Sequence, residues 1–273
     1  MALAHQRVTA AGAQPSRWML FLHGILGRGQ NWRSIARRLV QAQPAMGAVL
    51  VDLRLHGGSQ GLPGPHTVEA AARDVAELTR ELGLRVRSIL GHSFGGKIAL
   101  TWARERAEDL DAVWLADSPP GARPGGDGAQ APFAVLDALE ALPRSFESRD
   151  EMVDALHARG FSRELGRWLA TNLERSEAGR YDLPLDVPGI RSMLEDYART
   201  DLWDQVEAPP GRHQVHLVVG GRSEVFGAQD RERAARAAES SARVHLHVLE
   251  DAGHWLHVEA PDALLSLLTA SAP

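Results

Sequence analysis

The sequence predicts an α/β fold in which a parallel β-sheet carries helices on both faces, and two observations lead to this prediction. Short, almost continuously apolar runs recur at residues 18–22, 48–51, 88–90 and 112–116. Such runs are typical of parallel strands that are buried on both sides. Segments with apolar residues at helical spacing separate these runs, and right-handed crossovers of this kind build a doubly wound sheet.

Length and composition fit a compact globular protein. The 273 residues suit one large α/β domain with a modest insertion. Hydrophobic residues make up 44% and charged residues 24%, which excludes a disordered chain. The formal net charge of -5 gives no reason to expect nucleic acid or an anionic membrane as a partner, and a neutral small molecule is the more natural ligand.

The chain contains no cysteine, which excludes disulfides, thiolate metal sites and a cysteine nucleophile. Residues 1–14 lack the basic stretch and long apolar run of an export signal, and residues 18–22 are too short to span a bilayer. We therefore expect a cytoplasmic protein with no membrane partner, either a monomer or a weak homo-oligomer. Lys97 is the only lysine, and the sequence assigns it no function.

Helices are expected between the strands. Apolar positions share one helical face over residues 32–40 and again over residues 68–82. A further helix over about residues 95–106 leads to the strand at residues 112–116, which ends at Asp117.

The alternation then stops at residues 119–121, which read PPG, and a glycine-rich stretch continues to Gly128. Helical segments without intervening strands follow at residues 133–142, 148–158, 163–173 and 189–199. We predict a helical cap at residues 119–205, inserted into a core domain formed by residues 1–118 and 206–273. After the insertion the sheet resumes with strands at residues 213–219 and 244–248, a helix over residues 230–239 between them, and a closing helix near residues 261–268.

Residues 91–96 read GHSFGG and place a G-x-S-x-G pattern between an apolar strand and a helix. In that setting the serine occupies a sharp, strained turn above the carboxyl edge of the sheet, and side chains at Gly91 and Gly95 would force the turn open. The helix N-terminus also favours developing negative charge. We therefore predict that Ser93 is a nucleophile and does more than cap the helix, the ordinary role of such a serine.

A second glycine turn, LHGILG at residues 22–27, follows a strand and is expected at the same edge of the sheet. We predict an oxyanion hole formed by the amides of Phe94 and Ile25. His23 precedes the turn, so we expect it to hydrogen-bond the loop.

His254 stands in AGHW at residues 252–255, after the last strand and before the closing helix. A nucleophile elbow of this topology places its residues in the chain order serine, acid, histidine, so the base is expected here. His245 and His247 lie inside the strand, and His257 lies further on. We predict that His254 is the general base.

Two carboxylates compete for the acid that supports His254. Asp117 ends the strand at residues 112–116, and Glu224 lies just after the strand at residues 213–219. Either strand end reaches the histidine loop in principle, because the acid only has to orient and support the imidazole. We favour Asp117 and keep Glu224 as the alternative acid.

Residues 52–59 read DLRLHGGS, and we interpret Asp52, Arg54 and His56 as groups that fix loops through ion pairs and hydrogen bonds. The histidines and carboxylates show no H-E-x-x-H or comparable spacing. We therefore expect neither a metal nor a cofactor.

Taken together, these motifs resemble the α/β-hydrolase superfamily along nearly the whole chain, through LHG at 22–24, DLRLHGGS at 52–59, GHSFGGK at 91–97 and AGHW at 252–255. Within it the chain looks like the YbfF-type bacterial esterases and the ABHD11-like hydrolases, through ADSP at 116–119, VGGRS at 219–223 and GHWLH at 253–257. The resemblance implies an α/β-hydrolase fold whose helical cap follows the strand at 112–116, the sixth in the numbering of that fold.

The resemblance also implies a chemistry. The YbfF-type esterases lack the usual acid after the seventh strand and use an aspartate after the sixth, which corresponds to Asp117. We expect a serine hydrolase that cleaves carboxylic esters or thioesters of small to medium acyl chains through Ser93, His254, Asp117 and an acyl-enzyme intermediate. The same triad also serves acyl transfer, carbon-carbon bond hydrolysis or perhydrolysis. A non-catalytic small-molecule binding protein is the rival from another class.

Overall fold

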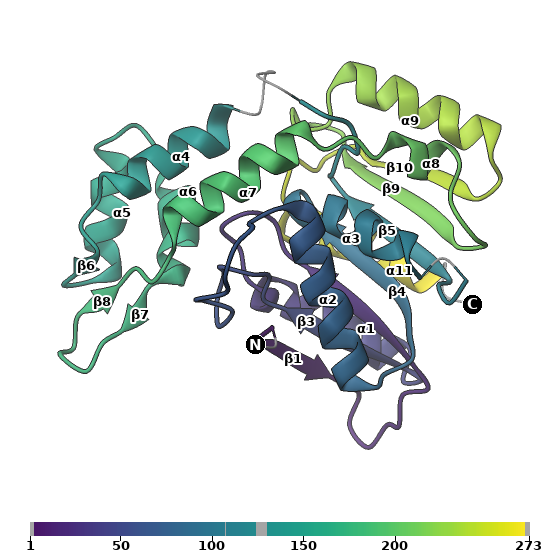
Figure 1. The fold of residues 1–273 in the computed structure, drawn as a ribbon, viewed down its shortest axis with the longest axis horizontal. Coiled ribbons are helices and arrows are strands. Elements are labelled where there is room, and N and C mark those ends of the chain that lie inside the picture. Colours follow the sequence, from purple (N-terminus) through teal and green to yellow (C-terminus); the bar gives the residue numbers. More distant parts are fainter. Residues whose placement is uncertain (1–2, 107, 124–129, 271–273) are drawn as a thin grey trace.

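The computed structural model describes residues 3–106, 108–123 and 130–270. Within these ranges seven strands form one sheet in the order β1-β3-β2-β4-β5-β9-β10 (Figure 1). Their bounds are β1 His5–Val8, β2 Arg17–Leu22, β3 Met46–Val51, β4 Val86–His92, β5 Ala112–Ala116, β9 Gln214–Gly220 and β10 Val244–Leu249. Neighbouring strands pair in parallel, except that β1 pairs antiparallel with β3. The predicted α/β fold with a mostly parallel sheet is confirmed.

Helices cover both faces of the sheet. On one face lie α1 (Arg33–Ala42) and α11 (Pro261–Ala270), and on the other lie α2 (Val68–Leu82), α3 (Phe94–Arg104) and α9 (Ala228–Ser240). Strand residues alternate between the two faces, so Phe21 packs with the α1 face and Leu22 with the opposite face. Two short helices, η1 (Gly29–Trp32) and α10 (Leu256–Glu259), follow strands at the sheet edge. No helix in the described ranges is both long and apolar enough to cross a bilayer.

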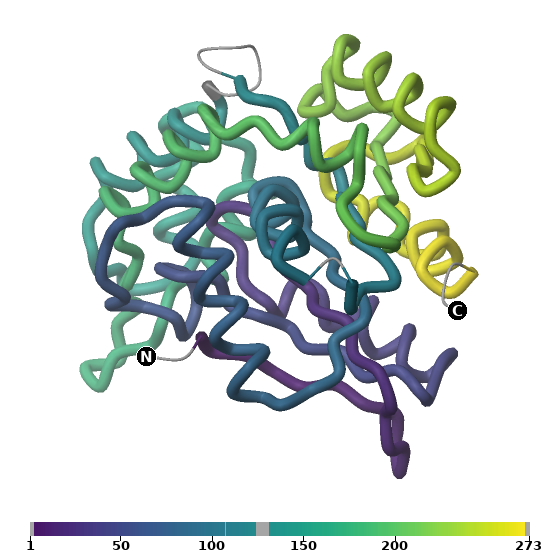
Figure 2. Tube along the Cα trace, turned by 45° about the vertical axis from the view of Figure 1, so that its right-hand side comes forward, coloured from purple at the N-terminus to yellow at the C-terminus, as the bar shows by residue number. Residues whose placement is uncertain are grey.

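Between β5 and β9 the chain leaves the sheet. It forms α4 (Gln130–Glu140), α5 (Arg149–His157), α6 (Arg163–Leu169), η2 (Ala170–Asn172), α7 (Val187–Arg199) and α8 (Trp203–Glu207). Figures 1 and 2 show α4 to α7 gathered on one side of the sheet. We call residues 119–205 the cap segment; its separation from the core as a domain at these boundaries stays a prediction. Of the predicted glycine-rich entry, residues 124–129 lie outside the described residues.

Two features differ from the sequence-based expectation. The cap segment was expected to be helical without strands, but β6 (Ser145–Phe146), β7 (Glu174–Arg175) and β8 (Tyr181–Asp182) form a small antiparallel sheet. Strands of two residues are too short to show the alternation that reveals a strand in a sequence. The edge strand β1 was also missed, because three of its four residues are exposed and polar or charged, so that no apolar run marks it.

The single lysine joins the core to the cap segment. Lys97 lies on α3, one turn after Ser93, and is only 1% exposed. Its ammonium group donates to the carbonyl oxygens of Gly121, Tyr197 and Thr200 at 2.8, 2.7 and 2.7 Å. The last two belong to the C-terminal end of α7, where unpaired carbonyls favour a cation. Burial lowers the pKa of Lys97 to about 7. This side chain therefore fixes the end of α7 to the helix that follows Ser93.

Candidate active site

The turn between β4 and α3 has the strained shape predicted for it. Ser93 has φ 50° and ψ −117°, a conformation that residues with a side chain rarely adopt. A Cβ atom on Gly91 would collide with the carbonyl of Gly95, and one on Gly95 would lie 2.6 Å from the carbonyl oxygen of His23. The glycines therefore allow the close approach that holds Ser93 at the tip of the turn.

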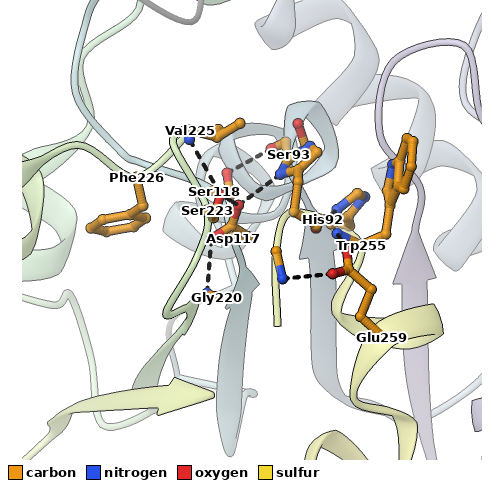
Figure 3. Close-up of polar contacts among 12 residues, drawn as sticks. His92, Ser93, Asp117, Ser118, Gly220, Ser223, Val225, Phe226, Trp255 and Glu259 are labelled. Atoms are coloured by element: carbon orange, nitrogen blue, oxygen red, sulfur yellow. Dashed lines mark hydrogen bonds and ion pairs between the residues drawn. The ribbon is translucent and has the colours of Figure 1, made fainter. Parts of the chain in front are cut away.

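Asp117 follows β5 and is fully buried, and three donors surround its carboxylate. Oδ1 accepts from the amide of Gly220 at 3.1 Å, and Oδ2 accepts from the hydroxyl of Ser223 at 2.5 Å (Figure 3). Oδ2 also contacts Nδ1 of His254 at 2.7 Å. Because a carboxylate can only accept, Nδ1 of His254 is the donor of this hydrogen bond, so in the neutral ring Nε2 is the nitrogen without a proton.

The alternative acid Glu224 lies in a different setting. Its side chain is exposed, whereas the contact to the ring of His254 comes from Asp117. Ser223, the neighbour of Glu224, ends the VGGRS stretch at residues 219–223, but no role was predicted for it, because a serine in a loop gives no sign that it bonds to Asp117. Its place in the loop after β9, beside the alternative acid Glu224, is the feature of the sequence that points to it. Ser223 reaches the imidazole only through Asp117.

Side chains fix the backbone on both sides of His254. Glu259 accepts from the amides of Gly253 at 2.8 Å and Trp255 at 3.1 Å (Figure 3). Nε2 of His92 donates to the carbonyl oxygen of His254 at 2.9 Å. Burial lowers the pKa of His92 well below its ordinary value, so that the ring is neutral. The loop that carries His254 is thus held by one carboxylate and one neutral histidine.

The loop after β2 is held by two buried histidines. Nε2 of His23 accepts from the amide of Leu53 at 3.0 Å. Nε2 of His56 accepts from the amide of Leu26 at 3.0 Å, while its Nδ1 donates to the carbonyl of Arg54 at 2.8 Å. Burial lowers the pKa values of both rings, which keeps the accepting nitrogens unprotonated. These contacts confirm the loop-fixing roles predicted for His23 and His56.

Asp52 and Arg54 fix neighbouring loops, as predicted. The carboxylate of Asp52 accepts from the amides of Gly29 at 2.7 Å and Gly58 at 2.9 Å. Arg54 forms an ion pair with Asp74 at 2.6 Å. In the described part of the chain, no group of three or more histidine, aspartate or glutamate side chains is arranged to hold a metal ion.

A cavity of about 380 Å³ lies above this edge of the sheet. Its lining includes four of the predicted site residues: Ile25, Ser93, Phe94 and His254. Phe133, Leu165 and Trp168 of the cap segment make much of the remaining wall apolar. Apart from the histidines and Tyr197, Arg123 is the one ionisable side chain in the described lining, and it forms an ion pair with Asp230. The cavity therefore suits an uncharged, apolar ligand.

Comparison with known proteins identifies one family. The chain matches the family described as alpha/beta hydrolase over residues 19–267. The sn-1-specific diacylglycerol lipase ABHD11 of Danio rerio is 27% identical over 266 residues, which cover 96% of this chain and 80% of the lipase. Esterase YbfF of Escherichia coli is 26% identical over 261 residues, 94% of this chain and 93% of the esterase. A solved esterase from a marine microorganism has a TM-score of 0.84 at 24% identity and covers 99% of each chain.

The neutral state of His56 predicts a pH dependence of stability. Burial lowers its pKa from 6.5 to about 4, so between these values the unfolded chain binds the proton and the folded chain does not. The free energy of unfolding therefore falls as the pH drops from 7 to 4, by roughly 3 kcal/mol from this histidine. In urea unfolding at a series of pH values, His56→Gln should lose less stability over this range than the wild type. Parallel pH profiles for the two proteins would contradict the assignment.

Proposed function

The chain belongs to the alpha/beta hydrolase family, and from this premise we propose that it hydrolyses carboxylic esters through an acyl-enzyme on Ser93. One observation carries the proposal: His254, held by the buried Asp117, lines the same cavity as the strained Ser93. The names of similar proteins, an esterase and a diacylglycerol lipase, support ester hydrolysis as the reaction.

The reaction begins when Oγ of Ser93 attacks the ester carbonyl while Nε2 of His254 takes the hydroxyl proton. The carbonyl oxygen becomes an oxyanion, which accepts hydrogen bonds from the amides of Ile25 and Phe94. Phe94 is the first residue of α3, so its amide has no partner within the helix. Asp117 supports the imidazolium form of His254 during this step.

His254 then gives its proton to the leaving alcohol, and the acyl group remains on Ser93. A water molecule next attacks the acyl carbonyl while His254 accepts a proton from it. The second tetrahedral intermediate collapses, the carboxylic acid leaves, and the proton returns to Oγ of Ser93. A thioester would follow the same course with a thiol as the leaving group.

The cavity supports a neutral acyl group of small to medium length. Its volume of about 380 Å³ lies at the lower end of the range for small-molecule sites. Because Asp230 already neutralises Arg123, the described lining offers no free charge to an anionic acyl group. Esters of uncharged, apolar acids are therefore the proposed substrates.

Removing the nucleophile tests the proposed reaction. Ser93→Ala should lower the turnover of p-nitrophenyl butyrate by at least about a thousandfold and abolish labelling by a fluorophosphonate. The exposed serine of α11 provides a matched control, since Ser266→Ala should keep wild-type turnover. Turnover that survives Ser93→Ala in a clean preparation would rule out the acyl-enzyme mechanism.

The acid is tested by a pair of neutralising substitutions. Asp117→Asn keeps the size of the side chain but removes the charge that supports His254, so kcat should fall by about 10³-fold to 10⁴-fold. Glu224→Gln removes an exposed charge and should leave kcat near the wild-type value. Thermal unfolding establishes that both variants are folded. If only Glu224→Gln were inactive, the assignment to Asp117 would be wrong.

A further inference from the structure

One side chain of the cap segment reaches into the loop that carries Ile25. Asn172 of η2 is 1% exposed, and its Nδ2 donates to the carbonyl oxygen of Leu26 at 2.8 Å, across 146 positions of the chain. Its Oδ1 is buried and has no hydrogen-bond partner among the described residues. A buried amide that satisfies only one of its ends is costly, which indicates that the contact with Leu26 is the reason for its position.

The loop after β2, which accepts the hydrogen bond from Asn172, has a strained backbone at Leu26. Gly24 and Gly27 close a tight turn, with the amide of Gly27 donating to the carbonyl of Gly24 at 3.0 Å. Ile25 and Leu26 are the two central residues, and Leu26 has φ 61°, the left-handed region. A leucine is sterically disfavoured in this region, so the turn persists only where its surroundings hold it.

Two side chains form hydrogen bonds with the backbone of Leu26. His56 of the core accepts from its amide at 3.0 Å, and Asn172 donates to its carbonyl oxygen at 2.8 Å. The first contact fixes the peptide plane between Ile25 and Leu26, and the second fixes the next plane along the chain. The Leu26–Gly27 peptide also contains the amide of Gly27, which donates to the carbonyl oxygen of Gly24 at 3.0 Å. That carbonyl belongs to the same peptide group as the Ile25 amide, so the contact with Asn172 acts on the orientation of this amide.

The segment that carries Asn172 is itself anchored within the cap segment. Arg149 of α5 donates to the carbonyl oxygens of Ala170 and Leu173, the latter at 2.9 Å. These residues flank Asn172 on both sides. A series of hydrogen bonds therefore connects α5 through η2 to the turn after β2.

We propose that Asn172 is a positioning residue, which acts through Leu26 to hold the Ile25 amide in the direction required for oxyanion binding. Contact between the cap segment and the core thereby completes the oxyanion hole as well as the apolar wall. This inference rests on the proposed function, because it assigns Ile25 the role of an oxyanion donor.

The test uses Asn172→Asp in the full-length chain. The substitution keeps the shape of the side chain but places an oxygen in front of the Leu26 carbonyl oxygen, so the two groups repel. Misdirecting one oxyanion donor is a smaller defect than removing it, so kcat for p-nitrophenyl butyrate should fall by about 10-fold to 100-fold, with KM within about twofold of the wild type. The inhibition constant of a trifluoromethyl ketone, whose adduct with serine carries an oxyanion, should rise by the same factor.

Matched variants separate this role from a structural one. The neighbouring Thr171 is exposed and bonds only within the cap segment, so Thr171→Val should keep wild-type kcat. If Asn172→Asp does not fold, kcat and the inhibition constant of the trifluoromethyl ketone are measured for Asn172→Ala, and the same changes are expected. A folded variant with unchanged kcat, or with a changed KM alone, would overturn the proposal. A wild type that neither hydrolyses esters nor binds the ketone would overturn the proposed function, and this inference with it.

Discussion

The hydrogen bond between Asp117 and His254 is the contact on which the rest of the site depends. It joins the end of β5 to the loop after β10, and β9 lies between these two strands in the sheet. Asp117 therefore spans a neighbouring strand, and it does so while bonded to the amide of Gly220 at the end of β9. Its left-handed backbone, with φ 45°, directs the carboxylate across the sheet edge. The carboxylate of Asp117 thus connects the ends of β5 and β9 with the loop after β10, and it orients the ring of His254.

Neutral histidines hold several of the loops around this contact through hydrogen bonds to the backbone. Burial lowers the pKa values of His23, His56 and His92. As neutral rings they accept from or donate to backbone groups of the loops beside Ser93, which charged rings could not do in the same way. His254 differs from them, because 28% of its side chain is exposed and its ring faces a carboxylate. Of the four histidines that line the cavity, His254 is the one that bonds to the buried carboxylate of Asp117.

The parts of the site that could be predicted from the sequence are those that local patterns determine. Apolar runs mark the buried parallel strands, and the glycines around Ser93 are explained by close backbone contacts of the turn itself. The choice between Asp117 and Glu224 stayed open at that level, because β5 and β9 are neighbours and both strand ends reach the same edge. Burial and hydrogen bonds separate the two carboxylates in the folded chain.

What the sequence did not reveal depends on contacts between distant segments. Asn172 and Ser223 are ordinary polar residues, and only the folded chain brings them to Leu26 and Asp117. The same holds for Lys97, which lies on a helix of the core but bonds to carbonyl groups of the cap segment. The two-residue strands of the cap segment are likewise set by tertiary packing and carry no pattern of their own.

Covalent acylation of Ser93 would be visible in the mass of the intact protein. A p-nitrophenyl carbamate forms a carbamoyl-enzyme that water releases slowly, so the modified chain accumulates. After a short incubation and an acid quench, the wild-type chain should gain the mass of a single carbamoyl group, and peptide mapping should place it on Ser93. A chain that turns over esters yet gains no such mass, or carries it on another residue, would contradict the mechanism.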